Sequence, residues 1–472
     1  MNRLLPFAGA LVALALPSAA AAQGSAAAGP PAATVHAAQA DTARAPHDAQ
    51  KIVVRYKASA SLAARAAAQR DAGAGSPRSF APYTRTLRVR PGQSVAGALA
   101  RLRSRSDVAY AVPDYVAKAS YVPNDPGPPN TLGGWQSTQW NFLADTGVNA
   151  PVAWDHLIAA KRPGAKGVTI AVLDTGVAYS DRGRFKRSPD FAAGRFVQGY
   201  DFVGRDGFPN DENGHGTHVA GTIGESTNNG VALAGLAYGA RIMPVRVLNS
   251  RGEGDASDIA AGIRYAARHG AQVINLSLEF SAGVRQREIP GIIEAIRYAE
   301  KKNVVVVGAS GNEADSAIAY PARYSPVISV GATTEHLCVA DYANVGSGLD
   351  LVAPGGGGDA ENGGAASCRP DIKPLGRDIF QLTLNGSVRR FGYPDGYEGT
   401  SMAAPHVAAT AALIIASGVL GSSPTPDQIE ERLKSTARDL GPPGYDRRYG
   451  YGLIDAAKAT DPTVGPVIAP PQ

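Results

Sequence analysis

Three short polar motifs in this chain contain the residue types of nucleophilic catalysis. Asp174 directly follows the apolar run 168–173, and Thr and Gly come after it. His215 lies between two glycines in Asn-Gly-His-Gly-Thr-His, and Ser401 opens an apolar helical pattern in Gly-Thr-Ser-Met-Ala-Ala-Pro. A carboxylate that orients a histidine, a histidine that takes a proton and a hydroxyl that attacks a carbonyl together make a hydrolytic site.

Each motif also has an ordinary structural interpretation when it is taken alone. An Asp at a strand end commonly forms a turn, and a Ser before a helix is commonly its N-cap. His215 and His218 lack a third metal ligand at a telling spacing, and the chain contains no HExxH. The serine motif is not GxSxG, because Ala403 stands at the last Gly. The chain order Asp, His, Ser favours the catalytic interpretation.

These residues need a scaffold that brings them together. Short β-branched apolar runs alternate with helical patterns, and we expect strands at 167–173, 241–248, 271–278, 303–308 and 327–330, with helices at 256–268 and 291–301. Strands that are apolar on both faces and alternate with helices predict a buried parallel sheet in an α/β domain. Active-site residues gather at the carboxyl ends of such strands, where Asp174 stands.

With these motifs in this order, residues 124–459 resemble the subtilisin-like (subtilase) serine proteases. The resemblance implies an α/β, three-layer subtilisin-like fold with a mostly parallel sheet, preceded by a small α+β propeptide domain. It implies that Asp174 orients His215, that His215 is the general base and then the acid, and that Ser401 is the nucleophile. The side-chain amide of Asn312 would hold the oxyanion together with the Ser401 N–H, without any catalytic cofactor. The segment that carries this amide comprises Ala309, Ser310, Gly311 and Asn312.

The resemblance also implies that substrate lies extended between two strand edges, where main-chain pairing gives broad tolerance. The edges comprise Ser277, Leu278 and Glu279 on one side and Gly252, Glu253 and Gly254 on the other. Family members commonly have Gly where Glu279 stands. Glu279 either narrows the entrance to the S1 pocket or, with Glu313, favours a cationic substrate side chain. Ala409, where the family usually has Gly, adds one methyl to a packed helix.

A structural calcium site is a further implication of the resemblance, since this hard cation takes oxygen ligands. The candidate ligands are Gln139, Asp181 and Asn229, the last of which belongs to the irregular loop 227–231.

The N-terminus has the layout of a secretory signal peptide: Arg3, an apolar stretch at 4–16, and small residues at 19–22. We therefore expect a secreted protein, extracellular or periplasmic. No apolar run reaches the 18 or so residues of a membrane span. In an exported chain the two cysteines, Cys338 and Cys368, favour a disulfide of roughly 3–4 kcal/mol, with two inert thiols as the alternative.

Composition changes along the chain predict its domains. We expect a signal peptide at 1–22, an Ala/Pro-rich linker at 23–50, the inhibitory propeptide domain at 51–120, the catalytic domain at 121–460 and a Pro-rich tail at 461–472. Residues 1–120 have a net charge of +10 and the remainder −5, which favours docking of a basic propeptide on an acidic body. Random drift of surface charge is the alternative. The acidic body argues against nucleic acid as a partner.

Two functions remain open. The first is a secreted serine endopeptidase, made as a self-processing zymogen and cut near 118–122, whose partners are protein and peptide substrates and its own propeptide. The second is a catalytically silent or narrowly dedicated relative that binds peptides in the same groove. The presence of Asp174, His215, Asn312 and Ser401 favours the first. We expect a monomer.

Overall fold

The structure is a computed structural model that describes residues 47–115, 121–281, 283–360, 365–370 and 376–465 of the 472-residue chain. It divides into two compact units, one ending at Ala117 and one beginning at Lys118. The predicted signal peptide, most of the predicted linker and the end of the predicted tail lie outside the described residues.

The first unit is a small antiparallel sheet with two helices. Its elements are β1 (His47–Tyr56), α1 (Leu62–Asp71), β2 (Ala74–Ala81), β3 (Thr84–Val89), α2 (Val95–Arg103) and β4 (Val108–Tyr115), with strand order β2-β3-β1-β4. Ile52 and Val54 alternate toward the core, where Leu99 and Leu102 of α2 meet them. The pattern predicts these elements except β2, whose Gly, Ser and Pro hide the alternation, and β1 begins four residues before the predicted domain start.

The second unit is built on a seven-stranded sheet in which every neighbouring pair of strands is parallel. In spatial order the strands are β11 (Leu351–Pro354), β10 (Val327–Thr333), β9 (Val305–Ala309), β8 (Val273–Leu276), β5 (Thr169–Asp174), β7 (Arg241–Arg246) and β6 (Tyr200–Asp201). All five strands predicted from the sequence are present. β6 and β11 are too short to give a pattern of their own.

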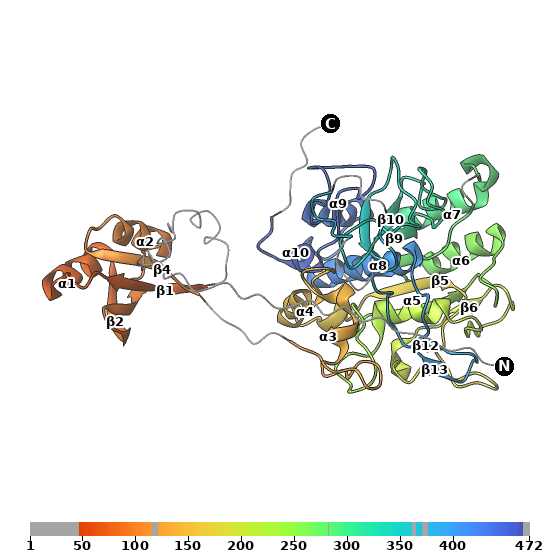
Figure 1. The fold of residues 1–472 in the computed structure, drawn as a ribbon, viewed down its shortest axis with the longest axis horizontal. Coiled ribbons are helices and arrows are strands. Elements are labelled where there is room, and N and C mark those ends of the chain that lie inside the picture. The colour runs from red at the N-terminus through yellow and green to blue at the C-terminus, as the bar shows by residue number, and fades with distance from the viewer. Residues whose placement is uncertain (1–46, 116–120, 282, 361–364, 371–375, 466–472) are drawn as a thin grey trace, which may run out of the picture. The chain divides into compact units, whose positions relative to one another are not determined.

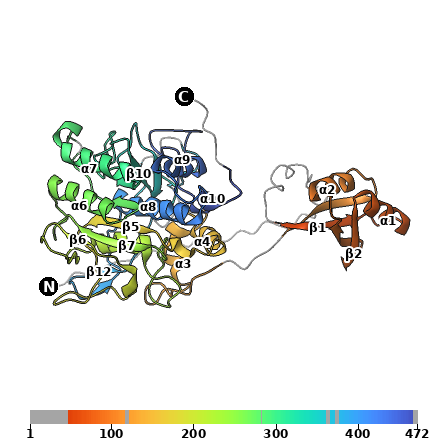
Figure 2. The same ribbon diagram turned by 180° about the vertical axis from the view of Figure 1, so that it is seen from behind.

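Helices cover both faces of this sheet and make three layers (Figures 1 and 2). One face packs against α4 (Ala150–Ala159), α5 (His215–Gly224), α8 (Thr400–Ser417), α9 (Pro426–Thr436) and α10 (Ala456–Thr460), and the other against α6 (Ala256–Arg268) and α7 (Pro290–Lys301). In β5, Ile170 and Val172 face the first set while Ala171 and Leu173 face the second. This two-sided burial explains the continuous apolar runs of the sequence.

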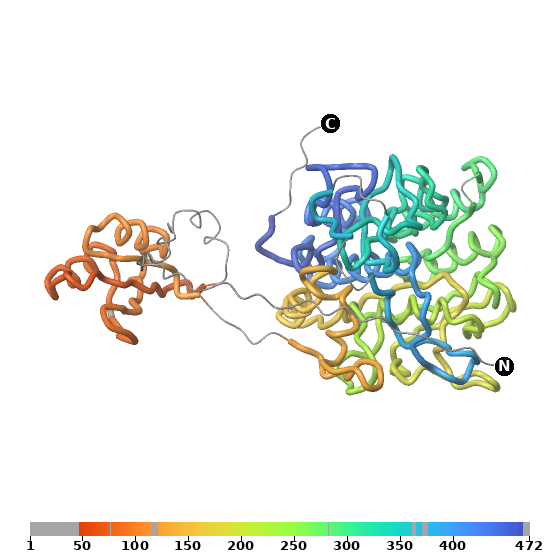
Figure 3. Tube along the Cα trace, viewed as in Figure 1, coloured from red at the N-terminus to blue at the C-terminus, as the bar shows by residue number. Residues whose placement is uncertain are grey.

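Shorter elements complete the unit. They are α3 (Trp135–Thr138), the strands β12 (Thr383–Leu384) and β13 (Phe391–Gly392), and the 3₁₀ turns Trp140–Phe142, Pro163–Ala165, Ala193–Arg195 and Gln286–Glu288. Figure 3 traces the β12–β13 hairpin beside the chain that leads into α5, where the Thr383 hydroxyl donates to the Gly214 carbonyl. Cys338 and Cys368 form the expected disulfide.

Helix α8 is the central helix of the core. Within the described ranges it alone is long and apolar enough to cross a membrane, and 78% of its apolar window is buried inside the fold. Ala409 is fully buried there, so its methyl group is accommodated by the packing. The helix begins at Thr400, directly after Gly399, so that Ser401 lies in its first turn.

Candidate active site

The candidate site lies where one strand ends and two helices begin. Asp174 is the last residue of β5, His215 is the first residue of α5, and Ser401 is in the first turn of α8. His215 and Ser401 line a cavity of about 570 Å³. The same cavity is lined by both predicted substrate edges, namely Gly252, Glu253 and Gly254 on one side and Ser277, Leu278 and Glu279 on the other.

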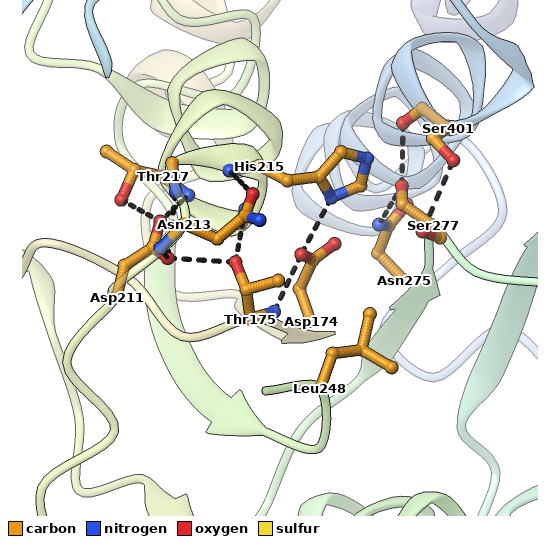
Figure 4. A network of polar contacts seen from close by, with 12 residues as sticks. Asp174, Thr175, Asp211, Asn213, His215, Thr217, Leu248, Asn275, Ser277 and Ser401 are labelled. Atoms are coloured by element: carbon orange, nitrogen blue, oxygen red, sulfur yellow. Dashed lines mark hydrogen bonds and ion pairs between the residues drawn. The ribbon is translucent and has the colours of Figure 1, made fainter. Parts of the chain in front are cut away.

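The buried carboxylate of Asp174 fixes the imidazole of His215. Nδ1 of His215 lies 2.7 Å from Oδ1 of Asp174, which also accepts from the Thr175 N–H at 2.7 Å (Figure 4). A Cβ at Gly216 would lie 2.1 Å from the Gly176 carbonyl oxygen, so only glycine allows α5 to start this close to β5. Because Nδ1 donates to the carboxylate, Nε2 is left to accept a proton.

Opposing effects act on the pKa of His215. Burial acts to lower this pKa, but the charge of Asp174, the hydrogen bond to it and the charge of Asp211 outweigh burial, and the pKa is raised. The imidazole is therefore a stronger base than a free histidine.

Ser401 and Ser277 are joined by two hydrogen bonds. The Ser401 hydroxyl donates to the Ser277 carbonyl at 3.2 Å, and the Ser277 hydroxyl donates to the Ser401 carbonyl at 2.7 Å. The buried Asn275 donates to the Ser277 hydroxyl at 2.9 Å. Figure 4 shows the Ser401 hydroxyl turned toward Ser277, so that a hydrogen bond to His215 requires rotation about the Cα–Cβ bond of Ser401.

The amide of Asn312 is held in one orientation. Its Oδ1 accepts from the Thr400 N–H at 2.8 Å and from the Thr400 hydroxyl at 3.0 Å. A backbone N–H is only a donor, so the oxygen must face Thr400 and the NH₂ group must face away. Nδ2 donates to Oε1 of Glu279 at 3.3 Å. The candidate oxyanion donor is therefore in contact with a carboxylate.

Two residues of the predicted oxyanion segment, Ala309 and Ser310, are buried and have structural roles. Ala309 packs in the core at the end of β9, and the buried Ser310 hydroxyl donates to the Asn344 carbonyl at 3.0 Å. Neither residue lines the cavity. Gly311 has φ +115°, and a Cβ there would lie 2.1 Å from Nδ2 of Asn344 and 2.7 Å from Oε2 of Glu279. A side chain at Gly311 would therefore displace the Asn344 amide as well as the carboxylate of Glu279.

Asp211 is a buried acid that the sequence motifs did not single out. It accepts from the Thr175 hydroxyl at 2.9 Å, from the Thr217 hydroxyl at 2.6 Å, and from the N–H groups of Asn213, Gly214 and Thr217 (Figure 4). It thus links the end of β5 to the first turn of α5, where a helix favours negative charge. Burial raises the pKa of Asp211. The sequence signal that could have identified Asp211 is its position two residues before the Asn-Gly-His motif.

His218, three residues after His215, is a packed structural histidine. It stacks on Tyr397 with ring centroids 4.2 Å apart, and its Nε2 donates to the Ile379 carbonyl at 2.9 Å. Burial lowers the pKa of His218 to about 3, so the ring is neutral. This agrees with the sequence argument against a metal-binding histidine pair.

Each of the three candidate calcium ligands has a partner from this chain. Gln139 exchanges two hydrogen bonds with the backbone of Ala234, and Asp181 forms an ion pair with Lys186 at 3.5 Å. Asn229 donates to Asp190 at 2.8 Å. The described residues include no group of three or more His, Cys, Asp or Glu placed to hold a metal ion. Structural calcium therefore stays a prediction from the family resemblance.

Buried acids hold the loop 227–231 instead. Asp125 accepts from the N–H groups of Asn228 and Asn229 at 2.8 and 3.1 Å, and Asp190 accepts from Leu233 N–H at 3.1 Å. Burial raises the pKa of Asp190 to about 7. Burial and the charge of Asp190 also raise the pKa of Glu225. No sequence motif predicted this acid cluster.

Comparisons with known proteins cover both compact units. Residues 165–452 match the Subtilase family (Peptidase S8), and residues 33–114 match the fervidolysin N-terminal prodomain. The chain is 34% identical over 409 residues to the thermophilic serine proteinase of Bacillus sp. (strain AK1), covering 87% of this chain and 86% of that one.

Two further proteins are similar over more than two thirds of this chain. Thermitase of Thermoactinomyces vulgaris is 35% identical over 339 residues, covering 72% of this chain and 99% of thermitase. A solved protease structure from Pseudoalteromonas arctica PAMC 21717 is 33% identical, with a TM-score of 0.56, and covers 73% of this chain and 100% of that chain.

Proposed function

The chain belongs to the subtilase family of serine peptidases and carries an N-terminal prodomain, and from this premise we propose that Asp174, His215 and Ser401 are its catalytic triad. The protein would then be a secreted endopeptidase, a monomer that hydrolyses protein and peptide substrates through an acyl-enzyme. The observation that carries the proposal is the 2.7 Å contact between His215 Nδ1 and the buried Asp174, beside a cavity that Ser401 also lines.

The mechanism follows from the direction of that hydrogen bond. Nε2 of His215 takes the hydroxyl proton of Ser401 as its oxygen attacks the substrate carbonyl, and the proton then passes to the leaving amine. Water attacks the acyl-enzyme with His215 again as base, which restores the Ser401 hydroxyl and releases the acid. Asp174 stays ionised and stabilises the imidazolium. No step uses a cofactor.

The oxyanion would be held by two neutral donors. The Ser401 N–H lies in the first turn of α8, where helix N–H groups are unpaired, and Asn312 Nδ2 is oriented by Thr400. Fixed donors stabilise developing charge without reorganising. For Asn312 to act, its contact with Glu279 must be exchanged for the substrate oxygen.

Features of the first unit support the proposal that the protein is made as a zymogen. It matches a prodomain, and residues 1–120 have a net charge of +10 against −5 for the remainder. The N–H of Tyr121 donates to Asp155 at 2.8 Å, and its ring packs on Trp154 and Tyr238. A cut before Tyr121 would leave this packing intact. We therefore propose self-cleavage between residues 116 and 121.

Intact masses of the exported protein and its Ser401→Ala variant test this proposal. The wild type should lose its first 116–120 residues, and Ser401→Ala should keep the prodomain. Ser387→Ala, which removes an exposed hydroxyl on the β12–β13 turn, is the matched control and should mature normally. If Ser401→Ala matures as the wild type does, self-processing is wrong. If the mature wild type also hydrolyses no peptide, the silent peptide-binding relative becomes the better description.

A further inference from the structure

The carboxylate of Glu279 is incompletely paired. Oε1 accepts from Asn312 Nδ2 at 3.3 Å, which is long for a hydrogen bond to a carboxylate. Oε2 is buried and has no hydrogen-bond partner in the part of the chain that the structure describes. Burial of an acid in this state is unfavourable, and a cation is the partner that would compensate it best.

The charges around Glu279 favour the binding of a cation from outside the protein. Burial, together with the charge of Glu313, raises the pKa of Glu279, so its nearest charged influence is a second acid. Arg251 lines the same cavity, but its guanidinium donates to Glu253 at 2.8 and 2.6 Å. The cavity therefore contains a cation, Arg251, that is already paired with Glu253. It also contains an acid, Glu279, that has no cationic partner among the described residues.

Resting on the proposed function, the geometry points to a double role for Glu279: it selects a substrate with Lys or Arg on the amino side of the scissile bond, and that cation releases Asn312. In the free enzyme Glu279 holds the Asn312 amide. A substrate ammonium or guanidinium that pairs with Glu279 draws the carboxylate off Nδ2, which then donates to the oxyanion. Glu279 is thus a specificity-determining residue that acts on catalysis through Asn312.

This coupling predicts an effect on turnover as well as on binding. A substrate with an uncharged side chain leaves Glu279 on Asn312, so the oxyanion loses one donor. Removing one such donor in subtilisin, a member of the same family, lowers kcat by about 10²- to 10³-fold, which sets the upper limit of the effect here. A simple charge contact in the pocket would instead change KM alone.

The test compares two peptides that differ only in Lys or the uncharged norleucine before the scissile bond. We expect the mature wild type to prefer Lys by about tenfold or more in kcat/KM, with part of the preference in kcat. Glu279→Gln should reduce the preference to within about threefold. Glu279→Gly, which frees Asn312 altogether, should raise kcat for the norleucine peptide.

Glu294→Gln is the matched control, because it removes an exposed acid of α7 that does not line this cavity and should leave the Lys preference within about twofold. Equal cleavage of both peptides by the wild type would overturn the inference, and so would a preference that survives Glu279→Gln. A preference confined to KM would overturn the release of Asn312.

Labelling with diisopropyl fluorophosphate separates this inference from the proposed function. The reagent carries no cation and reports a reactive Ser401, and the labelled fraction gives the concentration of folded active sites for each variant. A labelled enzyme that cleaves both peptides equally contradicts only the role of Glu279. An enzyme that is neither labelled nor active contradicts the catalytic triad itself.

Discussion

Thr400 fixes Asn312 by donating to the same amide oxygen twice, from its N–H at 2.8 Å and from its hydroxyl at 3.0 Å. The same hydroxyl accepts from the Gly311 N–H at 3.2 Å. The residue next to the candidate nucleophile therefore determines where the candidate oxyanion donor points. This makes Thr400, which is buried and does not line the cavity, a candidate positioning residue.

Replacing Thr400 should separate positioning from binding. Thr400→Val keeps the shape and the N–H but removes the hydroxyl, so the Asn312 amide gains freedom and kcat should fall about tenfold with KM little changed. Thr400→Ser restores the hydroxyl and should recover most of kcat. Steady-state kinetics on one peptide measure both constants. Equal loss in both variants would contradict the positioning role.

Asp211→Asn should change both stability and the pH profile. An amide can accept with only one oxygen, so several of the donors around Asp211 lose their partner, at a cost of about 1–3 kcal/mol in the free energy of unfolding. The charge of Asp211 helps to raise the pKa of His215, so its removal should lower that pKa. His215 then stays neutral at lower pH, so the acid limb of the pH profile of kcat/KM should shift to lower pH. A limb that stays in place would contradict this charge effect.

The acid cluster should make stability depend on pH near neutrality. The pKa of Asp190 is raised to about 7 in the folded protein, above its value of about 4 when unfolded, so its contribution to stability is lost as pH rises from about 4 to 7. We expect the free energy of unfolding to fall by about 1 kcal/mol between pH 6 and 7 from this group alone. Denaturant unfolding of the inhibited enzyme measures it. Asp190→Asn should flatten the dependence over this interval.

A chelator tests the calcium prediction directly. Because this chain's own donors occupy Gln139, Asp181 and Asn229, and Asp125 and Asp190 hold the loop 227–231, EDTA should leave Tm within about 2 °C of its value in calcium. Differential scanning calorimetry of the inhibited mature protein makes the comparison. A fall of 10 °C or more would show that the loop rearranges to bind the ion, as the family resemblance implies.

The maturation site should follow the same preference as the substrates. Residues 116–120 lie outside the described ranges, and their sequence Val-Ala-Lys-Ala-Ser contains one cation, Lys118. If Glu279 selects a cation, the mature chain should begin at Ala119, two residues before the anchored Tyr121. N-terminal sequencing reads this residue directly. Lys118→Ala should slow maturation or move the cut, and Lys118→Arg should preserve both.

The sequence predicted most of the sheet and the residues expected to do the chemistry, for physical reasons. The apolar run of β5 is long and buried on both faces, and Asp174, His215 and Ser401 stand in long ordered motifs. β2 was missed because Gly, Ser and Pro interrupt its alternation.

Contacts between distant residues could not be predicted. Glu279 and Asn312 are 33 residues apart, and their contact depends on how β8 and β9 place the following loops. The contact of Asn229 with Asp190, which is 39 residues away, likewise depends on the fold.

Helix α8 joins the reactive end of the molecule to its interior. Ser401 is in its first turn, and the side chains from 402 to 414 are buried among the central strands and helices. The backbone that presents the candidate nucleophile is thus part of the core, so the first turns of the helix cannot unwind without exposing that core to water. We therefore expect the segment that carries the candidate nucleophile to open only together with the core, so that its amides exchange with solvent as slowly as those of the central strands.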